Sequence, residues 1–219
     1  MDHERFSRTL CTLSDIFGST IRPDGSNPKW FISFGSLLWF IRDRLLGREF
    51  EQDIDISMIY GAVDRNEIVG RFAEYGFTVD HELVDNHYHK PLQIVFKPTN
   101  PILANIHIDL WFWVIAGQYA WHSYDPLGQG RTILPSYTFK GTPKDLILAE
   151  TISYPWEEIA PPMNFPTMYG SLLDTWYPPV KGPDGRYVPN TGWLFPNRQY
   201  GQSRCPVTKT VQSCKEMIG

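Results

Sequence analysis

Apolar and polar residues recur along the chain with helical and strand-like periods. From Arg5 to Phe17 apolar side chains return every three or four residues, which predicts a helix with one buried face. Trp30 to Phe34 suits a short strand, and the residues from Leu37 to Leu45 present a helical apolar face after a Gly35-Ser36 turn. Alternation within Phe50 to Tyr60 predicts a strand with one apolar face and one acidic face.

The middle of the chain reads mainly as β-sheet. Asp64 to Tyr75 fits a capped helix closed by Gly76, and three strand patterns follow at Phe77 to Val84, Leu92 to Lys97 and Asn105 to Ile115. After Gly117 the sequence is dense in Pro, Gly and aromatic residues, which predicts loops and hairpins with one helix at Lys144 to Ile152.

These patterns predict an α/β (α+β) fold, in which a small mixed sheet is flanked by helices and followed by a loop-rich C-terminal part. We expect one domain over residues 1–180 and a Pro/Gly-rich tail over residues 181–219, because that stretch has few aliphatic side chains.

Charge and cysteine content exclude several classes of protein function. The formal net charge is −4, so the chain has no overall positive field that would recruit nucleic acid. Its three cysteines fit neither a disulfide framework nor a zinc knuckle, which favours a reducing compartment. The start has no secretory pattern, and the best apolar stretch is interrupted by His107 and Asp109, so we expect no membrane span.

Three aspartates are the strongest candidates for chemistry. Asp53 and Asp55 are two residues apart on a predicted strand and therefore share a face, and Asp109 lies on a later strand. If those strands are neighbours, the three carboxylates converge. Mg²⁺ or Mn²⁺ prefers such oxygen ligands, and two ions about 4 Å apart can hold the attacking and leaving oxygens of a phosphoryl transfer. A pair of aspartates spaced this way also occurs on solvated strand edges without any metal.

The Gly35-Ser36 turn precedes this acidic strand and is a candidate phosphate site. Free backbone N–H groups, a hydroxyl and the positive end of a helix dipole suit a phosphate. Arg42 follows on the same predicted helix, either as a further phosphate ligand or as an ordinary surface arginine.

The sequence from Gly35 to Ile56 resembles the LicD family of phosphocholine transferases and their fukutin relatives, which belong to the nucleotidyltransferase-fold superfamily. Gly35, Ser36, Leu37, Leu38 and Arg42 match the first half of that family's motif, and Asp53 and Asp55 match its metal-binding aspartates. Phe50, Glu51 and Gln52 depart from the usual pattern. His107-Ile108-Asp109 is similar to the family's later aspartate, and Tyr169-Gly170 with Trp176 and Pro178 is similar to a downstream signature.

This resemblance implies transfer of a phospho-alcohol, such as phosphocholine or a phospho-polyol, from a CDP-activated donor to a glycan hydroxyl. Asp53, Asp55 and Asp109 would be the metal-binding and catalytic residues, and Gly35, Ser36 and Arg42 would bind the phosphate. Two alternatives stay open: transfer of the nucleotide itself, and an inactive module that binds a glycan or a protein. Members of this family work in the cytoplasm or, behind an N-terminal anchor, in the Golgi lumen. We therefore expect the chain as written to be cytoplasmic, and a longer form with an anchor to be Golgi-luminal.

Other residues allow competing interpretations. His87 and His89 with His107 and Asp109 fit the ligand types of an iron or zinc site, although exposed imidazoles at a turn are the commoner outcome. His107 is alternatively a partner that orients Asp109. Core packing is the favoured role for the aromatic run Trp111-Phe112-Trp113, and a buried thiol is favoured for Cys11. Exposed tryptophans in the Pro-rich loops, Trp176 among them, are candidates for stacking on a sugar.

Overall fold

The computed structural model describes residues 3–19, 29–37, 53–85, 90–121, 141–155, 162–176, 180–181 and 187–188. The longer helices are α1 (His3–Ser19), α3 (Arg65–Glu74) and α5 (Tyr169–Trp176), and α4 (Lys144–Leu148) is a short one. The strands are β1 (Trp30–Ile32), β2 (Asp53–Ile59), β3 (Phe77–Asp85), β4 (Lys90–Pro98), β5 (His107–Ala116), β6 (Tyr119–Trp121), β7 (Thr142–Pro143), β8 (Thr151–Pro155), β9 (Pro162–Pro166), β10 (Val180–Lys181) and β11 (Tyr187–Val188).

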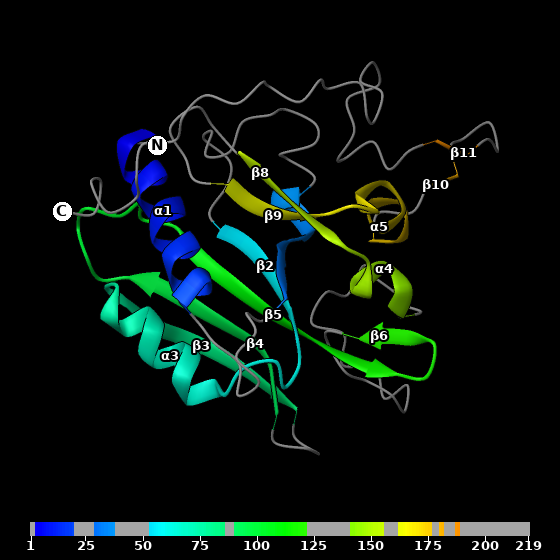
Figure 1. Cartoon of the computed structure of the whole chain (residues 1–219), viewed down its shortest axis with the longest axis horizontal. Helices are drawn as coiled ribbons and strands as arrows, with labels where there is room; N and C mark the ends of the chain where they lie inside the picture. Colours follow the sequence, from blue (N-terminus) through cyan, green and yellow to red (C-terminus); the bar gives the residue numbers. More distant parts are fainter. Residues whose placement is uncertain are drawn as a thin grey trace.

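A seven-stranded mixed sheet forms the centre of the molecule (Figure 1). Its main path runs β1-β2-β5-β4-β3, and β6 and β7 continue it from the end of β5. The pair β2 and β5 is parallel, whereas β1 with β2, β5 with β4 and β4 with β3 are antiparallel. This arrangement confirms a mixed α/β architecture with a curled sheet and several helices.

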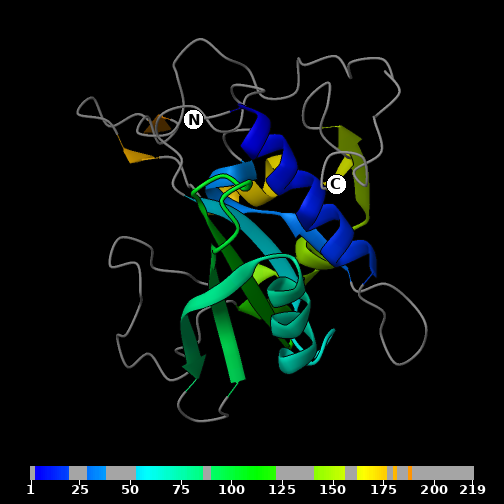
Figure 2. The same ribbon diagram turned by 90° about the vertical axis from the view of Figure 1, so that its left-hand side faces the viewer.

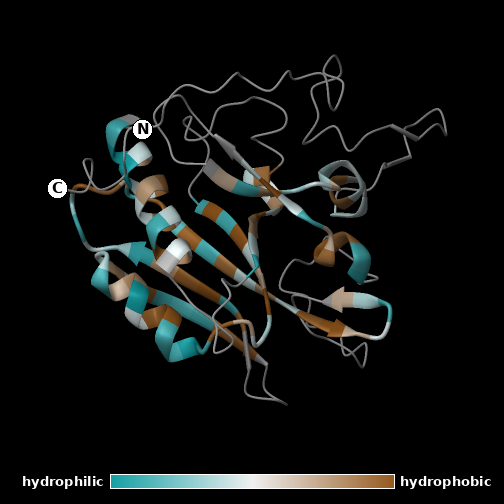
Figure 3. Cartoon of the chain, in the orientation of Figure 1, coloured by the Kyte–Doolittle hydropathy of each residue, from teal (hydrophilic) through white to brown (hydrophobic). Residues whose placement is uncertain are grey.

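Helices α1 and α3 lie on the same side of this sheet (Figure 2). They bury the apolar residues that alternate along β2, β4 and β5, together with their own apolar stripes, in one core. Hydrophobic and hydrophilic bands are visible along both helices in Figure 3. The core members from the three strands are Ile54, Ile56, Met58, Ile94, Phe96, Ile108, Leu110 and Phe112. Polar residues on these strands consequently point to the other face of the sheet.

The ends of α3 follow the sequence prediction closely. Asp64 is the N-cap, and its carboxylate accepts hydrogen bonds from the backbone N–H groups of Asn66 at 2.8 Å and Glu67 at 3.2 Å. Gly76 ends the helix with φ +82°, a conformation that favours glycine, and its carbonyl accepts the N–H of Thr99. The chain therefore turns from α3 directly into β3.

The C-terminal part contains more regular structure than we expect from its composition. The antiparallel pairing of β8 with β9 agrees with the predicted hairpins, whereas α5 forms where no helix is predicted. The predicted helix from Lys144 to Ile152 is wrong at its end, because α4 stops at Leu148 and Ile152 pairs with Phe165 in the hairpin. A β-branched residue between turn-forming neighbours suits a strand better than a helix end.

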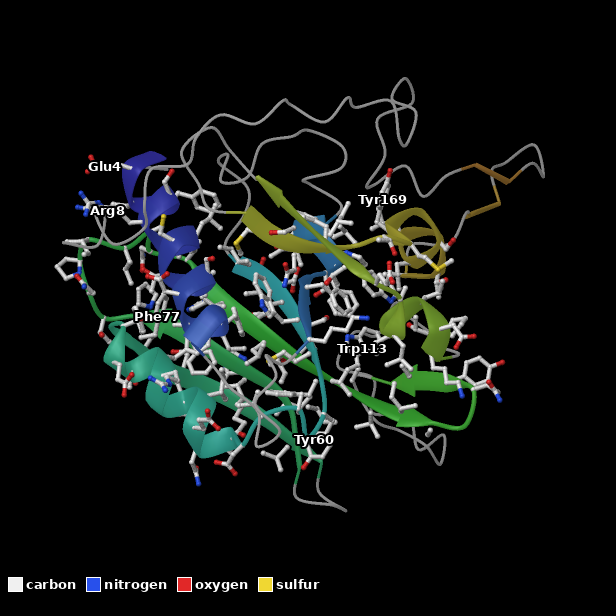
Figure 4. The ribbon with its side chains drawn as sticks, viewed as in Figure 1. Glu4, Arg8, Tyr60, Phe77, Trp113 and Tyr169 are labelled. Atoms are coloured by element: carbon white, nitrogen blue, oxygen red, sulfur yellow. The ribbon has the colours of Figure 1, made fainter. Side chains whose placement is uncertain are left out.

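Aromatic rings join α5 to the sheet. Phe34 packs against Trp111, Trp113 and Trp176 with ring centroids 5.4, 5.8 and 4.5 Å apart. Trp176 is 1% exposed, so the expectation that it offers an exposed ring to a sugar is wrong. In Figure 4 Phe77 lies near α3 and Trp113 lies toward α4, at opposite ends of the sheet. Burial of all three rings of Trp111-Phe112-Trp113 and of Cys11 confirms their predicted packing.

No helix within the described ranges is both long enough and apolar enough to cross a membrane. Of residues 181–219, the described part is Lys181 and β11, and the boundary expected at residue 180 stays a prediction.

Candidate functional site

The first three residues of the parallel strands β2 and β5 bring the predicted aspartates together. In their register Asp53 lies beside His107, and Asp55 lies beside Asp109. The intervening Ile54 and Ile108 are fully buried in the core under α1 and α3. All three carboxylates therefore project from the opposite face of the sheet, as we expect if the two strands are neighbours.

Asp55 is held by neutral hydrogen-bond donors in a buried position. Its side chain is almost inaccessible, and its Oδ1 accepts the indole Nε1–H of Trp111 at 3.0 Å. The backbone N–H of Ser36 points to Oδ2 at 3.4 Å, and the backbone N–H of Asp55 donates to Ser36 Oγ at 2.9 Å. Asp55 is thus fixed to the Gly35-Ser36 turn from one side and to β5 from the other.

Gly35 leaves room for this arrangement. A Cβ atom at position 35 would come within 3.2 Å of Asp55 Oδ2, closer than an ordinary van der Waals contact. The turn belongs to a helical stretch at residues 34–37, in which Leu37 N–H donates to the Ser33 carbonyl. Phe34 starts the stretch with φ +42°, unusual for a bulky residue, and its ring contacts with Trp111 and Trp176 hold it there.

Asp109 has a different hydrogen-bond partner from the one the sequence suggests. The buried Gln93 on β4 donates its Nε2–H to Asp109 Oδ2 at 2.9 Å. His107, the alternative that the sequence allows for this positioning role, interacts electrostatically with Asp53 and Asp80. Gln93 carries a detectable signal, since it is the one polar residue within the otherwise apolar run Leu92–Phe96.

Burial raises the pKa of each of the three carboxyls. For Asp55, burial has the largest effect, the charges of Asp53 and Asp109 raise its pKa further, and the Trp111 and Ser36 hydrogen bonds lower it. Burial and the charge of Asp53 raise the pKa of Asp109 to about 7. Burial also raises the pKa of Asp53, and the nearby His107 opposes that rise. The described residues around the site therefore do not supply enough positive charge or hydrogen-bond donors to compensate three ionised carboxylates at neutral pH.

Hard oxygen donors of this kind suit Mg²⁺ or Mn²⁺, and the charge imbalance is the kind that a divalent cation relieves. The buried hydroxyl of Ser57, two residues after Asp55 on the same strand, adds a polar atom without a hydrogen-bond partner among the described residues. Over the same residues, no three His, Cys, Asp or Glu side chains are grouped so that they could already hold a metal ion. The donor set fits such a cation in chemistry, and coordination by Asp55 Oδ2 would replace only its long contact with the Ser36 N–H while Oδ1 keeps the Trp111 hydrogen bond.

The structure places most of the other predicted residues but not all of them. Gly35 and Ser36 contact Asp55, so the predicted phosphate turn and the acidic strand form one site. Arg42, His87 and His89 lie outside the described residues. Sequence reasoning missed Trp111 and Gln93 as polar partners of the site. Trp111 was detectable because it lies two residues after Asp109 and so shares its strand face.

The sequence matches no protein-family model, and no curated protein matches it either.

Proposed function

We propose that this protein is a Mg²⁺-dependent phosphotransferase with a nucleotidyltransferase-like site, which moves a phospho-alcohol from a CDP-activated donor to a glycan hydroxyl. One observation carries the proposal: Asp53, Asp55 and Asp109 project from one face of adjacent parallel strands, and Asp55 among them contacts the Gly35-Ser36 turn. The motif resemblance supplies the donor and acceptor classes. The mixed sheet with helices on one face is compatible with the proposed fold family.

Electrostatics supports a cation and a phosphate at this place. Keeping three carboxyls together in a poorly hydrated site costs stability unless they are protonated or paired with a cation. Bound Mg²⁺ supplies that charge and neutralises the diphosphate of the donor. Asp53 and Asp55 would hold the cation, since they project from the same face of β2.

The Gly35-Ser36 turn would bind a phosphate oxygen. In the present structure the Ser36 N–H makes only a long contact of 3.4 Å with Asp55, and the Ser36 hydroxyl accepts a hydrogen bond while keeping its own proton to donate. If Asp55 turns toward a cation, that N–H becomes available to a phosphate. Gly35 permits close approach because it has no side chain.

Asp109 would take the proton from the attacking hydroxyl. A pKa of about 7 places this carboxyl close to the range in which a general base works at neutral pH. In the reaction a bond forms between the glycan oxygen and the donor phosphorus, and the bond from that phosphorus to the CMP oxygen breaks. The hydroxyl proton passes to Asp109 and then to solvent, and CMP leaves as the anion.

The activity test is the release of CMP from CDP-choline, CDP-glycerol and CDP-ribitol, with Mg²⁺ and mixed oligosaccharide acceptors. We expect metal-dependent CMP release with at least one donor, loss of release with EDTA, and at least a hundredfold lower rate in Asp53→Asn, which keeps the shape of the side chain. Cytidine retained on the acceptor would instead identify a nucleotidyltransferase. Equal CMP release by wild type and Asp53→Asn would contradict the proposal.

One observation favours the binding module as the second candidate. Asp55 is already satisfied by Trp111 and Ser36, an arrangement that a non-catalytic chain keeps without any metal. For such a module we expect oligosaccharide binding that is the same with Mg²⁺ and with EDTA. A glycan array probed under both conditions separates the two candidates.

A further inference from the structure

A group of basic residues lies on the site face of the sheet, over β5, β4 and β3. It consists of Lys97 on β4, His81 on β3 and His107 on β5, and we refer to it as the basic cluster. Lys97 follows Gln93 by four residues on the same strand, and Gln93 contacts Asp109, so Lys97 emerges from the same face. His81 lies beside Val95, which itself pairs with Asp109.

The exposed carboxylate of Asp80 contacts two members of the basic cluster. Lys97 Nζ donates to Asp80 Oδ1 at 2.7 Å, and His81 Nδ1 lies 3.1 Å from Asp80 Oδ2. The side chains of Lys97 and His81 are 49% and 62% exposed, so both can reach a ligand from solvent. An exposed ion pair of this type contributes little to stability, and its lysine is free to exchange Asp80 for another anion.

The histidines of the basic cluster interact electrostatically with the carboxylates of the site. His107 interacts with Asp53 and also with Asp80, and His81 interacts with Asp109. The face thus carries three carboxylates over β2 and β5, and the Lys97–Asp80 ion pair with His81 over β4 and β3. One strand, β5, separates Asp53 and Asp55 on β2 from Lys97 on β4, so a ligand with one phosphate at a cation on Asp53 and Asp55 has to span β5 to place a second anionic group at Lys97.

We propose that the basic cluster is a binding site for a phosphate group of the substrate, in addition to the phosphate at the Gly35-Ser36 turn. A lysine cation and two imidazole N–H donors together match the oxygens of a phosphate. The inference rests on the proposed function and extends it to the second anion of the bound substrates. That phosphate comes either from the diphosphate of the donor or from a phosphorylated acceptor.

The test measures ligand affinity by calorimetry in Mg²⁺ for wild type, Lys97→Met and Lys97→Arg. Arg71→Gln is the matched control, because it also removes an exposed cation from an ion pair but lies on α3, behind the sheet. The probes are inorganic pyrophosphate, CMP and CDP, and then glucose and glucose 6-phosphate added to the CMP-loaded protein.

If the donor supplies the phosphate, Lys97→Met binds CDP and pyrophosphate about tenfold more weakly and CMP as wild type does. If the acceptor supplies it, Lys97→Met loses affinity for glucose 6-phosphate alone. Lys97→Arg keeps most of the affinity in either case, and Arg71→Gln changes nothing. Wild-type affinity of Lys97→Met for every phosphorylated probe overturns the inference and leaves the proposed function standing.

A wild-type protein that binds pyrophosphate through Lys97 without any preference for cytidine nucleotides supports the basic cluster and contradicts the CDP donor. A wild-type protein that binds none of the probes overturns both.

Discussion

Asp55 is the residue on which the candidate site depends most. It is buried beside two other carboxyls, and its pKa is raised well above the ordinary value, chiefly by burial. The indole of Trp111 and the Ser36 backbone are the donors that favour its ionised form. A cation needs that ionised form, so these donors control how easily Asp55 binds one.

Replacing Trp111 with Phe tests this control. Trp111→Phe keeps an aromatic ring but removes the N–H that reaches Asp55. We expect the pKa of Asp55 to rise further and the affinity for Mg²⁺ to fall about tenfold at neutral pH, since a hydrogen bond to a charged group is lost. Calorimetric Mg²⁺ titration measures the change. Trp176→Phe is the control, because it loses an equivalent buried hydrogen bond to Thr142; equal Mg²⁺ affinities in the two variants would contradict this role.

Gly35 offers a second test at the scale of one residue. A methyl group at position 35 presses on Asp55 Oδ2, so Gly35→Ala is expected to weaken Mg²⁺ binding several-fold by displacing the carboxylate. Gly70→Ala, on the exposed part of α3 with open space around it, is expected to raise the free energy of unfolding by about 0.5–1 kcal/mol. Thermal unfolding and Mg²⁺ titration of both variants separate the two effects, and an unchanged Mg²⁺ affinity in Gly35→Ala would count against the close contact.

At the scale of elements, the sequence predicts those helix ends and strand faces that depend on local periodicity and on capping residues. The acidic face of β2 and the ends of α3 agree with expectation, because Asp64 and Gly76 act within a few residues of where they stand. The hydrogen bond from Gln93 to Asp109 depends on the pairing of β4 with β5. These two strands are consecutive in the chain, but their register depends on the geometry of the connection between them, so residue spacing alone left the contact open.

The C-terminal elements show a different limit. Pro and aromatic residues around Tyr169–Trp176 predict loops, yet α5 forms there because its apolar side buries Leu172, Leu173 and Trp176. Local propensity is outweighed by the burial of an amphipathic face. The same packing brings Trp176 to Phe34, a contact that no sequence pattern indicates.

Removing the α3 cap separates stability from function. Asp64→Ala loses two hydrogen bonds to backbone N–H groups, and we expect the free energy of unfolding to fall by about 1 kcal/mol. Chemical denaturation measures this loss. The affinity for Mg²⁺ should stay at the wild-type value, because α3 packs against the face of the sheet opposite Asp53, Asp55 and Asp109. A parallel loss of Mg²⁺ affinity would show that the two faces are coupled.

For the whole molecule, the site makes stability depend on pH. Carboxyls with raised pKa values keep their protons in the folded protein at pH values where the unfolded chain has lost them. Their contribution to stability is fully present below about pH 4 and is lost as the pH rises, for Asp109 up to about pH 7. We therefore expect the unfolding temperature of the metal-free protein to decrease as the pH is raised from 5 to 7.

Scanning calorimetry at several pH values measures this fall, and Asp109→Asn serves as the comparison because its amide does not titrate. We expect a weaker pH dependence in Asp109→Asn than in wild type. If the unfolding midpoint changes from pH 5 to 7 by the same amount in wild type and in Asp109→Asn, the raised pKa of Asp109 is contradicted.

The most direct test of the central claim is a thermal-shift titration of the purified protein with Mg²⁺ or Mn²⁺, alone and with CDP, CMP, ADP or GDP. A ligand that binds only the folded protein raises the unfolding midpoint. We predict a metal-dependent rise that is largest with cytidine nucleotides and absent in the folded double variant Asp53→Asn/Asp55→Asn. A wild-type midpoint that no metal and nucleotide combination moves would contradict the claim that these aspartates form a cation and phosphate site.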